Sequence, residues 1–277
     1  MTFADVNGIK ISYEIQGEGD PVILVHGFGV KKEVWMCQYG PLSEKFKVIR
    51  FDNRGAGESD HPDELFTMEM LAGDIRGLMD ALNLEKAHVV AWSLGGMFAQ
   101  HFAIKYPERL NKLVLINTLP NWPGGDEAGI KMYVDSQLAS IKAYQEDPIN
   151  AFFERAPMGY SRKFKKEMQE DTRKKFHGLF SVEDYVQMKT TNIPTPKDIE
   201  NQANALKYHD VIDKLHLIKS ETLIITADKD RQTPMSRNQL IHEKIPNSKL
   251  VVIAGAGHDS PLEKAPEINK HIIDFLS

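Results

Sequence analysis

The sequence has almost no cysteine, no long apolar run and no excess of positive charge. Its single cysteine, Cys37, excludes an intrachain disulfide and suits a reducing compartment. No stretch approaches the roughly 20 apolar residues that a membrane-spanning helix needs. The opening segment, MTFADVNGIKISYEIQG, lacks the basic start and apolar core of a signal peptide. We therefore expect a cytoplasmic protein with no membrane span.

The formal net charge of −5 provides no basic field that would attract nucleic acid or an anionic membrane. One basic stretch, residues 162–175, is interleaved with glutamate and aspartate, which is typical of a solvated helix face. We expect no nucleic-acid partner, and the sequence leaves the oligomeric state open.

The chain has 277 residues, of which 42% are hydrophobic, enough for one large domain that carries an insertion. An Asn7-Gly8 dipeptide predicts a hairpin near the start. Short apolar runs then alternate with segments of helical spacing, which predicts an α/β fold with a wound parallel sheet and covering helices. The expected strands are residues 21–25, 47–51, 86–92, 110–116, 222–226 and 249–253. The expected helices of this part are residues 67–82, 95–105 and 268–276.

Residues 119–217 contain no convincing strand and begin with the breaker-rich segment 120–125, PNWPGG. A block of about a hundred residues is too long for a simple loop. We expect residues 1–118 and 218–277 to form the core domain, with residues 119–217 inserted as a helical cap over the carboxyl edge of the sheet. The expected cap helices are residues 130–144, 149–155, 162–176, 182–189 and 196–208.

The stretch VVAWSLGG, residues 89–96, places a serine between a predicted strand and a predicted helix. A tight turn there lifts the Ser93 hydroxyl above the sheet, and it requires small residues two positions before and after, here Ala91 and Gly95. This is the G-x-S-x-G nucleophile elbow with alanine in the first glycine position. An ordinary helix N-cap is the alternative, so the hypothesis depends on partners elsewhere in the chain.

A serine nucleophile needs a base, and the base needs an acid that orients it. His258 is the candidate base because it follows the predicted strand 249–253 in the small-residue loop AGAG. The acid is expected after the strand at 222–226, where Asp228 and Asp230 are both candidates. The order serine, aspartate, histidine is the one that accompanies the elbow motif.

The sequence HGFG, residues 26–29, follows the first buried strand. From this position the backbone amide of Phe28, together with that of Leu94, can form an oxyanion hole. We expect His26 to be structural. This chemistry needs no metal and no organic cofactor. The residues expected to line a substrate pocket are Trp92, Trp122, Phe152, Met158 and Tyr160.

Six blocks in order make the sequence resemble the α/β-hydrolase superfamily over nearly its whole length. The blocks are HGFG (26–29), FDNRGAGES (51–59), AWSLGGMFAQ (91–100), YPERLNKLVLIN (106–117), LIITADKDRQTP (223–234) and GAGHDSPLE (255–263). Alanine replaces the usual glycine at position 91 and again at position 227, where the acid motif begins. Neither change removes a reactive group.

The resemblance implies an eight-stranded, mostly parallel sheet with a helical cap after the sixth strand. It implies that Asp52, Arg54 and Gly55 shape a loop beside the site rather than react. Its acid motif places a proline four positions after the aspartate, which selects Asp230 because Pro234 is in that register. The elbow SLGGMFAQ is similar to those of capped esterases, lactonases and enol-lactone hydrolases.

Together these features predict a serine hydrolase that cleaves a small carboxylic ester or lactone through an acyl-enzyme on Ser93. The same triad also serves cleavage of a carbon–carbon bond in a β-diketone, or perhydrolase chemistry. A ligand receptor with a retained triad is a third hypothesis. Haloalkane dehalogenases and epoxide hydrolases use an aspartate nucleophile, which the serine at this position disfavours.

Overall fold

The computed structural model describes residues 2–277, and they form one eight-stranded sheet in the order β1-β2-β4-β3-β5-β6-β7-β8. The first hairpin turns at Asn7 and Gly8, whose φ angles are 50° and 83°. β1 and β2 are antiparallel to their neighbours, and all later strands are parallel. The strands are β1 Thr2–Val6, β2 Ile9–Gln16, β3 Pro21–Val25, β4 Lys47–Phe51, β5 Ala87–Trp92, β6 Leu110–Ile116, β7 Glu221–Ala227 and β8 Ser248–Ile253. The predicted fold class is therefore confirmed.

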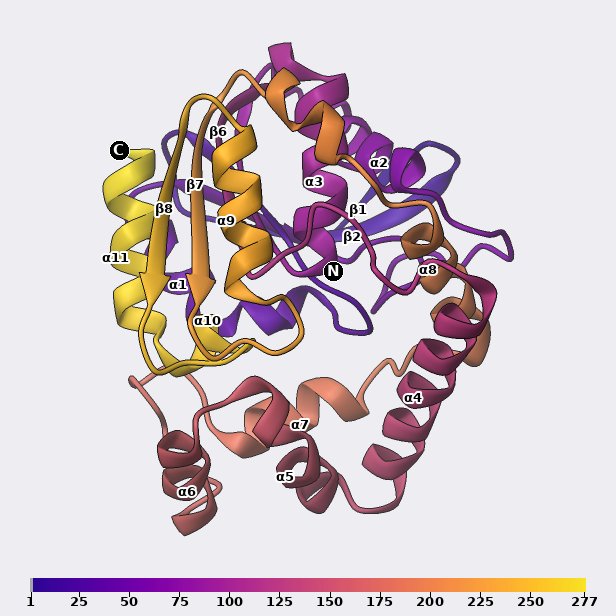
Figure 1. The fold of residues 1–277 in the computed structure, drawn as a ribbon, viewed down its shortest axis with the longest axis vertical. Helices are drawn as coiled ribbons and strands as arrows, with labels where there is room; N and C mark the ends of the chain where they lie inside the picture. Colours follow the sequence, from indigo (N-terminus) through magenta and orange to yellow (C-terminus); the bar gives the residue numbers. More distant parts are fainter. Residues whose placement is uncertain (1) are drawn as a thin grey trace.

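The central strands are apolar on both faces because helices cover both. Ile23 and Val25 belong to the core beneath α2, α3 and α9, whereas Val22 and Leu24 face α1 and α11. Figure 1 shows α9 and α11 on opposite sides of β7 and β8. The helices of this part are α1 Tyr39–Ser43, α2 Met68–Ala81, α3 Leu94–Lys105, α9 Met235–Lys244, α10 Ser260–Glu263 and α11 Ala265–Leu276. Short 3₁₀ helices add η1 Lys32–Cys37, η2 Pro107–Arg109 and η3 Ile212–Leu217.

Helices occupy the stretch between β6 and β7, as the sequence predicts. They are α4 Glu127–Glu146, α5 Pro148–Gly159, α6 Arg162–Glu170, α7 Val182–Thr190 and α8 Pro196–Lys207. In Figure 1, α5, α6 and α7 lie beyond the carboxyl ends of β7 and β8. The chain enters and leaves this region side by side, because the Val211 amide donates to the Pro120 carbonyl at 2.9 Å. The division into a core and a cap at residues 118 and 218 stays a prediction.

One predicted helix is wrong in its extent. The helix expected over residues 162–176 ends at Glu170. The Asp171 carboxylate accepts the Arg173 amide at 2.9 Å, a local bond that replaces helical pairing. Phe176 then pairs with Phe180 in an isolated bridge, and both rings pack into the cap interior.

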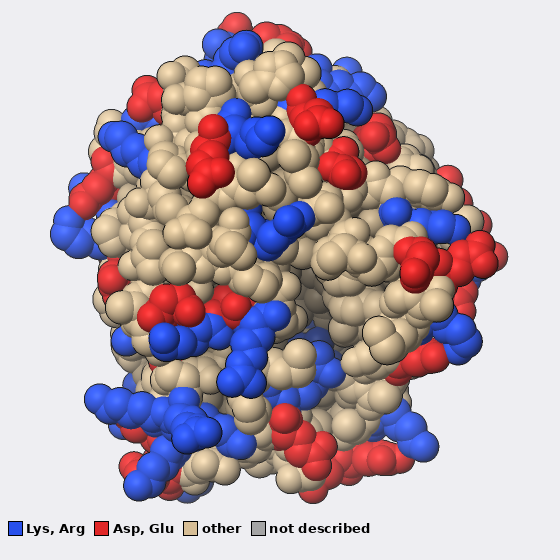
Figure 2. All heavy atoms as spheres, viewed as in Figure 1, with Lys and Arg blue, Asp and Glu red and all other residues tan. Residues whose placement is uncertain are grey.

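The surface carries charges of both signs. Figure 2 shows acidic and basic side chains interspersed over one face, with basic groups gathered over α6. In α6, Lys163 and Lys166 are exposed while Phe164 and Met168 are buried, as expected for a solvated helix face. Within residues 2–277, no helix has the length and apolar character to cross a bilayer.

Candidate active site

Ser93 lies on a strained turn between β5 and α3. Its φ of 58° lies in the left-handed region, which costs a residue other than glycine on the order of 1–3 kcal/mol. Gly95 is small for a direct reason, since a Cβ there would lie 2.4 Å from the Val25 carbonyl oxygen. The Ser93 side chain makes no capping hydrogen bond to α3, which argues against an ordinary N-cap. The turn instead frees the hydroxyl for another partner.

That partner is His258. The Ser93 hydroxyl lies 3.0 Å from His258 Nε2, and His258 Nδ1 lies 2.7 Å from Asp230 Oδ2. Asp230 is also held by Thr233, whose hydroxyl and amide donate to its two oxygens at 2.5 and 2.9 Å. His258 and Asp230 are each only 6% exposed. The structure thus joins three residues that are far apart in the sequence into one continuous hydrogen-bond chain.

The electrostatics of the pair favour a charged histidine beside a charged aspartate. Burial lowers the pKa of His258, but the charge of Asp230 and its hydrogen bond raise that pKa more, so the net value lies above the ordinary one. Burial raises the pKa of Asp230, but His258 and the Thr233 hydrogen bonds lower it to a net value below the ordinary one. An imidazolium formed during a reaction is therefore stabilised by the ionised Asp230.

Asp228, the other candidate acid, makes different contacts. Its Oδ1 accepts the Gly255 amide at 2.7 Å, and its carboxylate lies 3.3 Å from the Lys229 ammonium. These contacts join the acid loop to the loop that precedes the base. Asp230, and not Asp228, is the aspartate in contact with His258.

Of the two amides expected to bind an oxyanion, one belongs to Leu94, directly after Ser93, and the other to Phe28 in the 26–29 loop. The 26–29 loop runs directly against this serine, since a Cβ on Gly27 would lie 3.1 Å from Ser93 Cβ. Within residues 2–277, neither the Phe28 amide nor the Leu94 amide donates a backbone hydrogen bond. Both donors are therefore free to bind an oxygen that develops negative charge.

Neighbouring residues fix these loops, as the family resemblance implies. His26 is fully buried, donates from Nδ1 to the Gly27 carbonyl and accepts the Asn53 amide at 3.0 Å. Burial lowers the pKa of His26, which keeps the ring neutral and suits a structural role. The Asp52 carboxylate lies 2.7 Å from the Lys32 ammonium, and Arg54 pairs with the carboxylate of Asp74.

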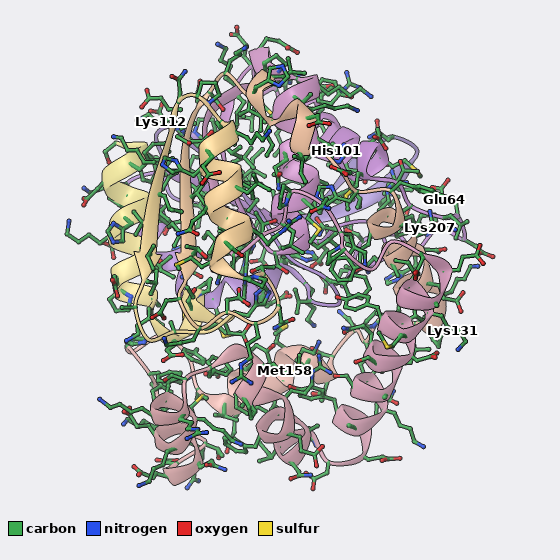
Figure 3. The ribbon with its side chains drawn as sticks, viewed as in Figure 1. Glu64, His101, Lys112, Lys131, Met158 and Lys207 are labelled. Carbon is green, nitrogen blue, oxygen red and sulfur yellow. The ribbon has the colours of Figure 1, made fainter. Side chains whose placement is uncertain are left out.

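A cavity of about 120 Å³ opens in front of Ser93 and His258. Phe28, Trp92, Phe152, Met158 and Tyr160 line it, and all but Phe28 are predicted pocket residues. Figure 3 shows Met158 between the cap helices and the sheet. Residues of α4, α5 and α7 and of the loops at the carboxyl edge of the sheet therefore line the cavity together.

The prediction that Trp122 lines this cavity is wrong. The Trp122 amide donates to the His209 carbonyl at 2.9 Å, where the chain enters and leaves the cap, and this pairing holds its backbone there. Its ring packs edge-on against Tyr133 at 5.0 Å, and Tyr133 in turn contacts Phe28 at 4.9 Å. Trp122 therefore lies one ring behind the cavity wall.

Three charged residues in the cavity wall were not expected from the sequence. They are Arg155 of α5, Lys189 of α7, and Asp259, which follows the candidate base. Asp259 directly follows the candidate base His258, and this position alone indicates that its side chain lies near the site. Arg155 and Lys189 each lie three positions after a buried apolar residue, Phe152 and Val186, and this shared helix face was the signal for them.

Metal ligands are not gathered anywhere in the described chain. Among residues 2–277, no group of three or more His, Cys, Asp and Glu side chains has the arrangement of a metal site. Cys37 is fully buried, and burial raises the pKa of its thiol to about 12. It therefore behaves as a small packing residue.

A family model described as the alpha/beta hydrolase fold matches residues 20–265. The chain belongs to this family. A 2-hydroxy-6-oxo-6-phenylhexa-2,4-dienoate hydrolase from Comamonas testosteroni is 30% identical to it over 98% of this chain and 93% of the relative. The hydrolase is also similar to a solved esterase from Thermogutta terrifontis, with 28% identity, a TM-score of 0.81 and coverage of 99% and 97%. An enol-lactonase from Burkholderia xenovorans LB400, at 22% identity, TM-score 0.80 and 99% coverage of both chains, shares the fold.

Proposed function

We propose that this hydrolase cleaves a small carboxylic ester or lactone through an acyl-enzyme on Ser93. One observation carries the proposal: the unbroken hydrogen-bond chain from the Ser93 hydroxyl through His258 to Asp230, on a strained turn at the floor of a cavity. Serine, histidine and aspartate in this arrangement make a nucleophile, its base and an orienting acid.

In the first half-reaction, Ser93 Oγ attacks the carbonyl carbon while His258 Nε2 accepts the serine proton. The carbonyl electrons move to oxygen, where the Phe28 and Leu94 amides stabilise the negative charge. The carbon–oxygen bond to the alcohol then breaks, and His258 returns the proton to the leaving oxygen. In the second half, His258 deprotonates a water that attacks the acyl-enzyme, and Ser93 is released as the hydroxyl.

Carbon–carbon cleavage is a second candidate, favoured by the relative from Comamonas testosteroni. That protein is named as a hydrolase of an oxo-dienoate. Hydrolysis beside a ketone carbonyl breaks a carbon–carbon bond and releases a carbanion that must be protonated. The same serine, base and oxyanion donors serve both reactions, so the substrate decides between them.

A substrate screen tests the proposal. Purified protein is assayed against p-nitrophenyl esters of increasing chain length, γ- and δ-lactones, and β-diketones. Turnover of esters or lactones supports the proposal, whereas turnover of diketones alone moves the assignment to the second candidate. If none of the three groups turns over above a Ser93→Ala control, the proposal is wrong.

The rate is expected to fall in acid with a midpoint above about 6.5, the ordinary pKa of histidine. His258 must be neutral to accept the Ser93 proton, and Asp230 and Asp259 both raise its pKa. Asp259→Asn removes one of those negative charges and should move the midpoint of kcat/KM to lower pH. Asp135→Asn, at an exposed position of α4, is the matched control and should not move it. A rate that is constant from pH 5 to 8 would contradict His258 as the base.

The pocket wall is expected to set acyl-chain preference. Met158 lines the cavity and is 49% exposed, whereas Met132 on α4 is 71% exposed and lies outside the cavity lining, so the two methionines form a matched pair. Met158→Ala should change the ratio of kcat/KM between long and short acyl esters by roughly tenfold, since a lost apolar contact is worth about 1–3 kcal/mol. Met132→Ala should leave the ratio unchanged. Equal effects of the two substitutions would show that Met158 does not contact the acyl chain.

A further inference from the structure

The cavity in front of Ser93 has a charged end. Arg155 comes from α5, Lys189 from α7, and Asp259 from the loop after the base, and all three line the same cavity as Ser93. All three residues are half-buried. A purely apolar ester gains nothing from two cations in the pocket wall, because it would cover their charges without supplying a partner. The charged group that these residues bind would therefore be part of the substrate.

The Lys189 ammonium is fixed by one hydrogen bond and keeps further N–H donors for a ligand. Its ammonium donates to the Gly29 carbonyl at 2.8 Å and lies 5.6 Å from the ring centre of Tyr144. Burial lowers the pKa of Lys189 to about 8, and the Arg155 charge lowers it while Asp259 raises it. The ammonium is thus mostly charged at neutral pH. A lysine has three N–H donors, and the bond to Gly29 occupies only one of them.

The Arg155 guanidinium has still more hydrogen-bond donors without a partner among the described residues. Within residues 2–277 it makes no salt bridge and no side-chain hydrogen bond, although its positive charge influences the pKa of both Lys189 and Asp259. A guanidinium presents five N–H donors in a planar fork that matches a carboxylate. The Tyr160 hydroxyl, in a residue only 6% exposed, also has no hydrogen-bond partner among the described residues. The cavity wall therefore holds several donors without an acceptor.

Asp259 limits how much negative charge the pocket can accept. Burial raises its pKa to about 6, so it is mostly ionised at neutral pH. Apart from His258, the basic residues of the pocket wall are Arg155 and Lys189, and Asp259 is its one acidic residue. A monoanion matches this excess of one basic group, whereas a dianion such as a phosphate monoester would place a second negative charge beside Asp259.

We propose that Arg155 and Lys189 bind a carboxylate on the substrate, so that the natural ester or lactone is a monoanion. This inference rests on the proposed function for the position of the cleaved bond, but the binding of the anion does not depend on turnover. Arg155 supplies the planar fork, Lys189 a point charge beside the 26–29 loop, and Asp259 selects against a second negative charge.

The test measures binding to the Ser93→Ala protein, so that no ligand is consumed. Monomethyl succinate, glutarate and adipate are compared by calorimetry with neutral isosteres in which an isopropyl group replaces the carboxylate, as in methyl 5-methylhexanoate for the glutarate. A second pair, 4-acetoxybenzoate and 4-isopropylphenyl acetate, places the carboxylate on the leaving group. In at least one of these pairs the anion should bind roughly tenfold or more tightly, as for a hydrogen-bonded charge pair.

Variants assign that preference to residues. Arg155→Gln and Lys189→Gln should each reduce the anion-to-isostere affinity ratio by about tenfold, and Arg155→Lys should retain part of it. Asp259→Asn should raise the ratio, because it removes the opposing charge. Lys131→Gln is the matched control: Lys131 lies on the outer side of α4 (Figure 3), and its loss should change nothing. Melting temperatures show whether each variant is folded.

The outcomes distinguish a failure of the anion site from a failure of the proposed reaction. If no carboxylate binds more tightly than its isostere, or if Arg155→Gln and Lys189→Gln keep the full preference, the inference is wrong. Wild-type turnover of neutral esters in that case would leave the proposed function standing. Conversely, tight carboxylate binding that Arg155→Gln abolishes, with no ester or lactone turnover by the wild-type protein, would support the anion site and overturn the proposed reaction.

Discussion

Ser93→Ala is expected to reduce kcat for the best ester or lactone by about 10⁶-fold, the loss seen when a comparable triad serine is removed. Without Oγ no acyl-enzyme forms, and His258 has no nucleophile to activate. The remaining rate comes from the oxyanion donors and the cavity, which position a substrate but do not attack it. The measurement is kcat and KM with the purified variant, on the substrate identified by the screen.

The fold should survive this substitution. Alanine tolerates the Ser93 turn no worse than serine does, because both carry a single Cβ, so the melting temperature should stay close to the wild-type value. Ser136→Ala, at an exposed position of α4, serves as the matched control and should retain full activity. A Ser93→Ala protein with more than a tenth of wild-type kcat would rule out this serine as the nucleophile.

Asp230→Asn is expected to cost about 10⁴ in kcat, as the equivalent change does in another triad. The Asp230 carboxylate accepts the His258 Nδ1 proton at 2.7 Å, which leaves Nε2 free to accept the Ser93 proton. An amide nitrogen at that place holds the ring in the other tautomer. It also removes the negative charge that raises the pKa of His258.

Asp228→Asn is the matched control for that change, two positions away in the same loop. Its carboxylate contacts the Gly255 amide and Lys229 but not the imidazole, so the expected loss is below about tenfold. Steady-state kinetics on the same substrate compare the two variants. A larger loss for Asp228→Asn than for Asp230→Asn would transfer the role of the acid to Asp228.

Much of the fold and of the site can be predicted from the sequence, because the residue types of each segment are those that its place in the fold requires. The strand at 21–25 is apolar at every position, which only a sheet covered on both faces requires. The glycine two positions after Ser93 indicates a tightly packed turn, and in the structure the Val25 carbonyl leaves no room for a side chain there. Loops at the carboxyl ends of parallel strands meet at one edge, so the approach of His258 and Asp230 to Ser93 follows from their positions after β8, β7 and β5.

The packing of residues 119–217 is harder to predict from the sequence, because amphipathic spacing does not tell which neighbour a helix faces. The apolar size of Trp122 predicts a pocket residue, yet backbone pairing with residue 209 places it behind Tyr133. Arg155 follows buried Phe152 by three positions and Lys189 follows buried Val186 by three, so each shares the apolar face of its helix. The packing of α5 and α7 places both side chains in the cavity wall, which the spacing alone does not reveal. The end of α6 depends on one carboxylate, that of Asp171, which accepts the Arg173 amide at 2.9 Å.

Covalent labelling tests the central claim most directly. The intact protein is treated with a small fluorophosphonate, digested, and analysed by mass spectrometry for the modified peptide. The account predicts a single adduct, on Ser93, that forms more slowly as the pH falls through the pKa of His258 and is absent from the Ser93→Ala protein. An unmodified Ser93 peptide, or an equal adduct on another serine, would contradict it.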